Sequence, residues 1–390
     1  MGKNNEILVV TNYFPPEKGA ASNRLFSLVE NLSKNNYTVS VVCPLPNYPQ
    51  GKVFKKFKGK FFVENQEFFG KVFRLWLWPS NSSNKFVRMF SMLSFSISLS
   101  VFFISRRIPK KVVIQYSPVF VGFTASFWSW FFRKKIILNV SDLWPLAGLE
   151  MGLLKKGFYY SILSKMESFC YRKAHLILGQ SQEILNHIEK TGLEKQVFLY
   201  RNYPEFPAPN LAENSYQDSS INIVYAGLLG VAQGLYRICT EITFSENISL
   251  HIFGAGPEAE KIASLEKEYI YFHGEIDRDA LHKELQNYQI GFVPLVNRIY
   301  GSVPSKIFEL SRLGIPVLYF AGGEGEVLVR NNKLGWVLPV NNIDALQNFV
   351  DTINNEKLKR FSKKQVQENA VNNFNFTNQF QQLTKEITKL

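Results

Sequence analysis

The sequence predicts an α/β protein of two Rossmann-like, doubly wound domains that face each other across a cleft. Its 390 residues suffice for two domains of ordinary size, at roughly 150 residues a domain. Short β-rich runs alternate with helix-length segments along the chain, which is the pattern of parallel βαβ units. A proline-rich stretch at 201–220, without helix or strand periodicity, divides the series in two and is the expected linker.

The first half of the series predicts an N-terminal domain of residues 1–205. Strands are expected at 6–11, 37–43, 111–116, 135–140, 174–179 and 196–200, and helices at 20–34, 154–173 and 182–191. Two uncharged stretches, 89–105 and 112–132, are too polar or too interrupted to cross a bilayer. We expect them to be buried or interfacial segments, and a true transmembrane span is the alternative.

The second half predicts a C-terminal domain of residues 206–372. Its strands are expected at 221–226, 248–253, 269–272, 290–294 and 316–320, with helices between them. Residues 373–390 look like a final amphipathic helix, which we expect to pack back on the N-terminal domain. Because ligands of doubly wound folds bind outside the carboxyl ends of the strands, the site is expected in the cleft.

The charge is distributed unevenly between the two halves. Residues 1–205 hold 28 Lys and Arg against 12 Asp and Glu, a net charge of +16, whereas residues 206–390 hold 17 against 20, a net charge of −3. A basic half of this kind suggests an anionic partner, either a membrane surface or nucleic acid. A merely soluble basic surface is the other interpretation.

The composition excludes several classes of protein. With 46% hydrophobic and 20% charged residues, the chain is neither disordered nor collagen-like. The three cysteines, Cys43, Cys170 and Cys239, are too few and too scattered for a disulfide framework or a zinc cluster, and they fit a reducing cytoplasm. The apolar run near the N-terminus, ILVV, is shorter than the core of a signal peptide, so we expect no export.

Two short motifs in the second half each allow two interpretations. Gly254 and Gly256 follow an expected strand in HIFGAGPEA, which fits a weak dinucleotide fingerprint or, more generally, a close backbone approach to a phosphate. Asp277 and Asp279 spell the D-x-D pattern of some metal-dependent transferases. Their position just before a helix favours capping of that helix instead.

A basic and aromatic stretch in the first half, GKVFKKFKGKFF, suggests contact with an anionic surface. Lys55, Lys56, Phe57 and Lys58 form its centre. Basic residues interleaved with aromatic rings suit single-stranded nucleic acid, but they suit anionic lipid equally well. A solvated loop with some buried Phe residues is the third interpretation.

The segment from 293 to 320 carries the most specific pattern in the chain. A strand is followed by a loop with Arg298, and a helix opens at Pro304, Ser305 and Lys306. Glu309 lies three residues after Lys306, so the cation and the carboxylate share one helical face. With Gly314 and Pro316, this gives P-S-K-x-x-E-x-x-x-x-G-x-P.

This pattern resembles glycosyltransferase family 4, the retaining GT-B nucleotide-sugar transferases, and in particular a branch of bacterial polysaccharide and O-antigen enzymes. The resemblance extends over nearly the whole chain, through NYFPPEKGAASNRLFSL, PNYPQGKVFKKF, VSDLWPLAGLEMG, RNYPEF and VYAGLLGVAQGLYRI. Three positions depart from the wider family's pattern. Gly301 stands where a first glutamate is frequent, and Leu228 and Gln233 stand where an Arg and a Lys are frequent.

The resemblance implies a function and a set of site residues. The N-terminal domain would bind the acceptor and the C-terminal domain the donor. Lys306, Glu309 and Asp142 are the implied catalytic residues, with Lys306 facing the leaving diphosphate, Glu309 accepting from the ribose hydroxyls and Asp142 on the acceptor side. For Asp142, capping of its own loop is the other interpretation. The implied donor-binding residues are Gly19, Arg24, Gly227, Gly230, Gln233, Gly254, Gly256, Arg298 and Ser305, and Lys55, Lys56, Phe57 and Lys58 are the implied membrane or acceptor residues.

The implied reaction moves a hexosyl or N-acetylhexosaminyl group from a nucleotide diphosphate donor, with UDP as the expected nucleotide. The expected acceptor is a lipid-diphosphate-linked saccharide at the inner face of the cell membrane, in capsule or lipopolysaccharide synthesis. No cofactor, metal or nucleic acid is expected. Two alternatives stay open at this point: an oxidoreductase with a nucleotide cofactor, and a basic nucleic-acid-binding protein.

Overall fold

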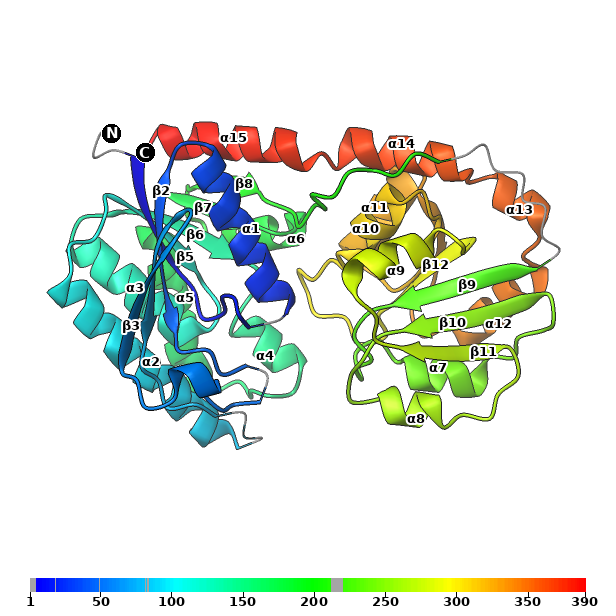
Figure 1. Cartoon of the computed structure of the whole chain (residues 1–390), viewed down its shortest axis with the longest axis horizontal. Helices are drawn as coiled ribbons and strands as arrows, with labels where there is room; N and C mark the ends of the chain where they lie inside the picture. The colour runs from blue at the N-terminus through cyan, green and yellow to red at the C-terminus, as the bar shows by residue number, and fades with distance from the viewer. Residues whose placement is uncertain (1–4, 18, 49, 81, 83, 212–219) are drawn as a thin grey trace. The chain divides into compact units, whose positions relative to one another are not determined.

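The computed structural model describes residues 5–17, 19–48, 50–80, 82, 84–211 and 220–390, so most of the polar part of the expected linker, 212–219, lies outside the described residues. The chain divides into two compact units (Figure 1). Unit 1 comprises Met1–Arg201 and Asn378–Leu390, and unit 2 comprises Asn202–Thr377. The boundaries expected from the sequence were 205 and 372.

Unit 1 is built on an eight-stranded sheet in the order β3-β4-β2-β1-β5-β6-β7-β8. The strands are β1 (Glu6–Val10), β2 (Thr38–Pro44), β3 (Phe62–Glu67), β4 (Gly70–Leu75), β5 (Lys111–Gln115), β6 (Lys135–Val140), β7 (Leu176–Gly179) and β8 (Gln196–Leu199). All pairs are parallel except the antiparallel pair of β3 and β4. The central strands read as continuous apolar runs because both faces of a parallel sheet are covered by helices.

The helices of unit 1 lie on both faces of this sheet. They are α1 (Ala20–Lys34), α2 (Lys85–Ser105), α3 (Val119–Phe131), α4 (Leu146–Glu150), α5 (Phe158–Lys173) and α6 (Gln182–Glu189), with a short 3₁₀ turn, η2, at Lys55–Phe57. Helix α3 packs between α2 and α5. Right-handed crossovers place α1 on one face and α3 on the other, since the two helices join strands in opposite lateral directions (Figure 1).

Unit 2 has a parallel six-stranded sheet in the order β11-β10-β9-β12-β13-β14. Its strands are β9 (Ile221–Ala226), β10 (Ile248–Phe253), β11 (Ile270–Gly274), β12 (Ile290–Pro294), β13 (Val317–Phe320) and β14 (Gly335–Leu338). Its helices are α7 (Leu235–Glu241), α8 (Ala259–Ala263), α9 (Arg278–Leu285), α10 (Lys306–Arg312), α11 (Glu324–Asn331), α12 (Ile343–Thr352), α13 (Asn355–Lys359) and α14 (Lys363–Asn373). This strand order is the Rossmann order, and it reverses between β9 and β12.

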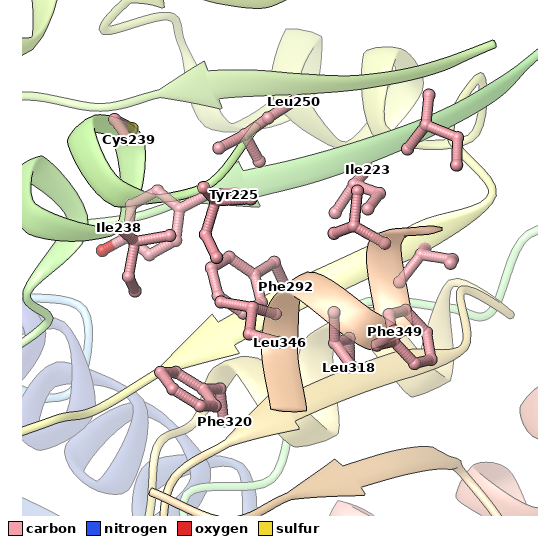
Figure 2. Close-up of a cluster of buried hydrophobic side chains, with 14 of the residues drawn as sticks. Ile223, Tyr225, Ile238, Cys239, Leu250, Phe292, Leu318, Phe320, Leu346 and Phe349 are labelled. Atoms are coloured by element: carbon pink, nitrogen blue, oxygen red, sulfur yellow. The ribbon is translucent and has the colours of Figure 1, made fainter. Parts of the chain in front are cut away.

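Two hydrophobic cores cover the faces of the unit 2 sheet. One contains residues of α7, α8 and α12, and Figure 2 shows its labelled side chains, among them Ile238, Phe292 and Phe349. The other contains residues of α9, α10, α11 and α14. Ile307 and Phe308 enter this second core from α10, so the helix that carries Lys306 and Glu309 is anchored directly to the sheet.

The last helix, α15 (Phe376–Thr388), packs on unit 1 through its residues from Asn378 onwards. The side chain of Gln379 accepts from the Arg201 N–H and donates to the Arg201 carbonyl, both at 2.9 Å. At the other end, the Lys111 ammonium donates to the Ile387 carbonyl at 2.8 Å. The helix therefore fastens the end of β8 to the start of β5.

Several elements differ from the sequence-based expectation. The stretch 89–105 lies within the long helix α2, and residues 119–131 of the stretch 112–132 form α3. The hairpin of β3 and β4 was not predicted, because β3 is an edge strand whose FVENQE sequence is largely exposed and lacks strict alternation. Strand β14 was also missed, because none of its four residues is fully buried. Among the described helices, none combines the length and the apolar character needed to span a bilayer.

Candidate active site

The switch point of the unit 2 sheet brings several predicted donor-binding residues together. The loop after β9 begins at Gly227 and runs to Gly234, which precedes α7. The loop after β12 is bonded to it, since the Asn297 N–H donates to the Ala232 carbonyl at 3.1 Å. Open α/β sheets bind ligands outside the carboxyl ends of the strands at such a reversal.

Gly254 and Gly256 are required by the packing of two loops. The Gly227 and Leu229 N–H groups donate to the Phe253 and Ala255 carbonyls at 3.0 Å each, which draws the β9 and β10 loops together. A Cβ at Gly254 would overlap the Gly227 carbonyl oxygen, and one at Gly256 would overlap the Leu229 carbonyl oxygen. The glycine spacing thus has a structural cause, and the N–H of Gly227, one of the implied donor-binding residues, is used inside unit 2.

Gln233 presents an unused acceptor at this loop. Its side chain is half-buried, and its Oε1 is shielded from solvent without a hydrogen-bond donor among the described residues. This oxygen lies close to Gly230, where a Cβ would be 2.9 Å from it. A buried carbonyl oxygen without a donor is costly, so a ligand N–H or O–H would be favoured there.

Arg298 and Ser305 lie on the segment between β12 and α10. The Arg298 guanidinium is 5.9 Å from the centre of the Tyr300 ring and packs against Gly323, where a Cβ would overlap it. Ser305 occupies the N-cap position of α10, but its side chain makes no capping hydrogen bond. The structure therefore gives Ser305 no helix-capping role.

Lys306 and Glu309 form an ion pair, and a third residue, His282, joins it. The Lys306 Nζ lies 2.8 Å from Glu309 Oε2, and the His282 Nε2 of α9 lies 2.8 Å from Glu309 Oε1. The Glu309 side chain is only 12% exposed. Burial alone would raise the pKa of Glu309, but the bonds to His282 and Lys306 outweigh it and lower the pKa to about 2. The carboxylate is therefore ionised at neutral pH.

His282 was not singled out by the sequence analysis. The residue lies in the middle of DRDALHKEL, and its proximity to Glu309 depends on how α9 and α10 pack. The prediction that Asp277 caps this helix is confirmed, because its Oδ2 accepts from the Asp279 N–H at 3.1 Å.

In unit 1, Arg24 and Asp142 lie close enough for their charges to interact. Arg24 Nη1 donates to Gln180 Oε1 at 3.0 Å, while its Nε is shielded and has no partner in the described part of the chain. Burial lowers the pKa of Arg24, and the nearby Asp142 and Tyr200 oppose this shift. Asp142 itself is exposed, just after β6, and accepts from the Ser141 hydroxyl at 3.3 Å.

The loop that contains Gly19 is fixed by a buried carboxylate. Glu17 is 3% exposed, and its Oε1 accepts from the Asn47 and Tyr48 N–H groups at 2.7 and 2.8 Å. Gly19 follows as the N-cap of α1, and a Cβ at this position would lie 3.6 Å from the Tyr48 ring. The β1–α1 loop is thereby attached to the loop after β2, a role for Glu17 that the sequence analysis did not identify.

The basic stretch needs one correction. Lys55, Lys56 and Lys58 are exposed as expected for a surface-binding loop. Phe57 is 7% exposed, and the Arg74 guanidinium of β4 lies 5.4 Å from the centre of its ring. Phe57 therefore anchors the turn to unit 1 and does not contribute to an exposed surface, whereas Phe61, at 74% exposed, does.

Comparison with known proteins relates this architecture to glycosyl transfer. Residues 222–355, wholly within unit 2, match the family model described as Glycosyl transferases group 1. No curated protein matches the sequence. Among solved structures, the sucrose-phosphate synthase of Thermosynechococcus elongatus is similar with a TM-score of 0.71 and 14% identity, covering 99% of this chain and 98% of that one.

Two further solved structures resemble the chain over nearly its full length. HepE of Anabaena in complex with UDP-glucose has a TM-score of 0.66 and 13% identity, covering 99% of this chain and 100% of that one. WaaG, a glycosyltransferase involved in lipopolysaccharide biosynthesis, has a TM-score of 0.65 and 12% identity, covering 98% of this chain and 99% of that one.

The chain has the GT-B fold. The prediction of two Rossmann-like domains is thus confirmed, while the facing of the two GT-B domains across a cleft stays a prediction. The family match and the GT-B fold together support a glycosyltransferase. An oxidoreductase or a nucleic-acid-binding protein would not be expected to combine a match to this family model with the GT-B fold.

Proposed function

We propose that the protein is a retaining glycosyltransferase that moves a hexosyl or N-acetylhexosaminyl group from a UDP-sugar to a lipid-diphosphate-linked saccharide. The acceptor lies at the inner face of the cell membrane, in the synthesis of a cell-surface polysaccharide. The observation that carries the proposal is the ion pair between Lys306 and the largely buried Glu309, inside the range that matches the glycosyltransferase model. The complex of HepE with UDP-glucose supports the choice of nucleotide.

The chemistry requires positive charge at the leaving group. Breaking the anomeric bond leaves an oxocarbenium-like sugar and a diphosphate with increased negative charge, so preorganised cations and N–H donors lower the barrier. Lys306 is the proposed cation. Leu228 and Gln233 provide none, and Arg298 is the second candidate.

The other site residues bind and orient the substrates in this proposal. Glu309 accepts from the ribose hydroxyls, and Gln233 Oε1 supplies a further acceptor. In unit 1, Gly19 and Arg24 belong to the donor side, while the exposed Asp142 faces the acceptor. Gly227, Gly230, Gly254, Gly256 and Ser305 form the backbone of the donor loops.

UDP is expected to stabilise the folded protein, and EDTA is expected to leave this effect unchanged. A ligand that binds only the folded state raises the free energy of unfolding by about 2.7 kcal/mol when its concentration is a hundred times its Kd. Uridine is the matched control, because it lacks the diphosphate that Lys306 would face. Melting curves with UDP, UDP with EDTA, and uridine measure this directly. Loss of stabilisation with EDTA and its return with Mn²⁺ or Mg²⁺ would show that the metal-free assignment is wrong.

The membrane contact is proposed on two exposed features of unit 1. Lys55, Lys56 and Lys58 surround the buried Phe57 near the exposed Phe61. Helix α2 exposes an apolar stripe at helical spacing, with Phe90 55%, Ile97 67%, Val101 60% and Ile104 62% exposed. Arg106, just after α2, lies 5.3 Å from the centre of the Phe62 ring and links the two features. An apolar stripe beside exposed cations suits an anionic lipid surface.

Co-sedimentation with vesicles of anionic lipid is expected to fall as salt rises, because salt screens the lysines over a Debye length of about 8 Å at physiological strength. The double variant Lys55→Glu/Lys56→Glu should co-sediment with these vesicles less than the wild type does. The matched control, Lys359→Glu/Arg360→Glu, makes the same change of charge at exposed positions of unit 2. If both double variants lose the same amount of vesicle binding, only the net charge matters and the Lys55–Lys58 site is wrong. Binding to neutral vesicles at every salt concentration would indicate insertion without electrostatic attraction.

A further inference from the structure

Glu309 has hydrogen-bonding partners on two different helices. Lys306 approaches Oε2 from the same helix, three residues earlier, and His282 approaches Oε1 from α9, each at 2.8 Å. The Lys306 side chain is 28% exposed, whereas His282 is 14% exposed. Of the two partners, Lys306 is therefore the one with more freedom to turn toward a ligand.

The His282 ring is itself held in place. The Phe206 ring packs on it with 4.3 Å between ring centres. The Phe206 carbonyl in turn accepts from Arg312 Nε, at the end of α10, at 2.6 Å. The segment around Phe206 thus joins α9 to α10, and it fixes the imidazole against the helix that carries Glu309.

We propose that His282 is a positioning residue, which keeps the Glu309 carboxylate in place for the ribose hydroxyls when Lys306 turns to the donor diphosphate. This inference rests on the proposed function. A carboxylate has about four acceptor sites, and the two bonds present leave capacity for a diol. Without His282, departure of Lys306 would leave the largely buried Glu309 carboxylate without a partner, which is costly for a charged group.

Three variants of His282 separate the hydrogen bond from the packing. His282→Phe retains a ring against Phe206 but has no N–H, whereas His282→Gln retains an N–H donor. Titration calorimetry with UDP is expected to give an about ten-fold higher Kd for His282→Phe and His282→Ala, and partial recovery for His282→Gln. With kcat nearly unchanged, the effect should fall on donor KM.

A second ligand makes the readout specific for the ribose. The wild type should bind 2′,3′-dideoxy-UDP more weakly than UDP, and His282→Phe should lose most of this discrimination. Glu309→Ala should lose it as well, and combining the two variants should add nothing, because both act through one carboxylate. Melting temperatures identify any variant whose affinity falls through misfolding.

Two outcomes would overturn the inference in different ways. If the wild type binds UDP and His282→Phe binds it with the same Kd and the same discrimination, His282 does not position Glu309, although the proposed function stands. If the wild type binds none of UDP, GDP and ADP, the proposed function fails, and the role of His282 fails with it.

Discussion

Replacing Lys306 with alanine is expected to lower kcat by roughly 10²–10³-fold, the usual effect of removing one preorganised donor at a developing charge. The melting temperature should change little. The Lys306 side chain is partly exposed, and Glu309 keeps its bond to His282 after the substitution, so the carboxylate is not left without a partner. Release of UDP from the donor and thermal melting measure the two effects.

The control for this variant is Lys283→Ala, which removes an exposed lysine from α9, next to His282. It should leave both kcat and the melting temperature close to the wild type. If Lys306→Ala retains a near-normal kcat, the leaving-group role is wrong and Arg298→Ala becomes the next test. A large fall in melting temperature would instead identify Lys306 as a structural residue.

Gly254→Ala is expected to destabilise unit 2 by more than the roughly 1–3 kcal/mol that an unfavourable backbone conformation usually costs. Gly254 has a φ of 145°, and its Cβ would overlap the Gly227 carbonyl oxygen. The β9 and β10 loops would have to separate, with loss of the hydrogen bonds between them. The free energy of unfolding in urea, measured without ligand, gives the effect.

The matched variant is Gly274→Ala at the end of β11. Gly274 has a φ of 74°, and no heavy atom of the described residues lies within 4 Å of the added Cβ, so this variant tests the conformational cost without a clash. Equal destabilisation by the two variants would show that a Cβ at Gly254 does not clash with the Gly227 carbonyl oxygen.

The sequence was most informative where local pattern and tertiary environment agree. The strand, loop and helix around Lys306 and Glu309 were predicted because apolar runs, Pro304 and the i, i+3 spacing all indicate the same local structure. His282 was missed because only the packing of α9 on α10 brings it to Glu309. Phe57 was misjudged because the pattern of Lys and Phe does not show which ring Arg74 covers.

The path of the chain through the two units has a consequence for synthesis and folding. Unit 1 is discontinuous: its last helical residues, after Thr377, are made only when all of unit 2 has been made. Unit 2 is contiguous and can fold during translation. At that stage Arg201, after β8, still lacks its hydrogen bond to Gln379, and Lys111, at the start of β5, lacks its hydrogen bond to Ile387. An early fold of unit 2 would bring its two ends together and shorten the loop that α15 must close, which reduces the entropic cost of completing unit 1.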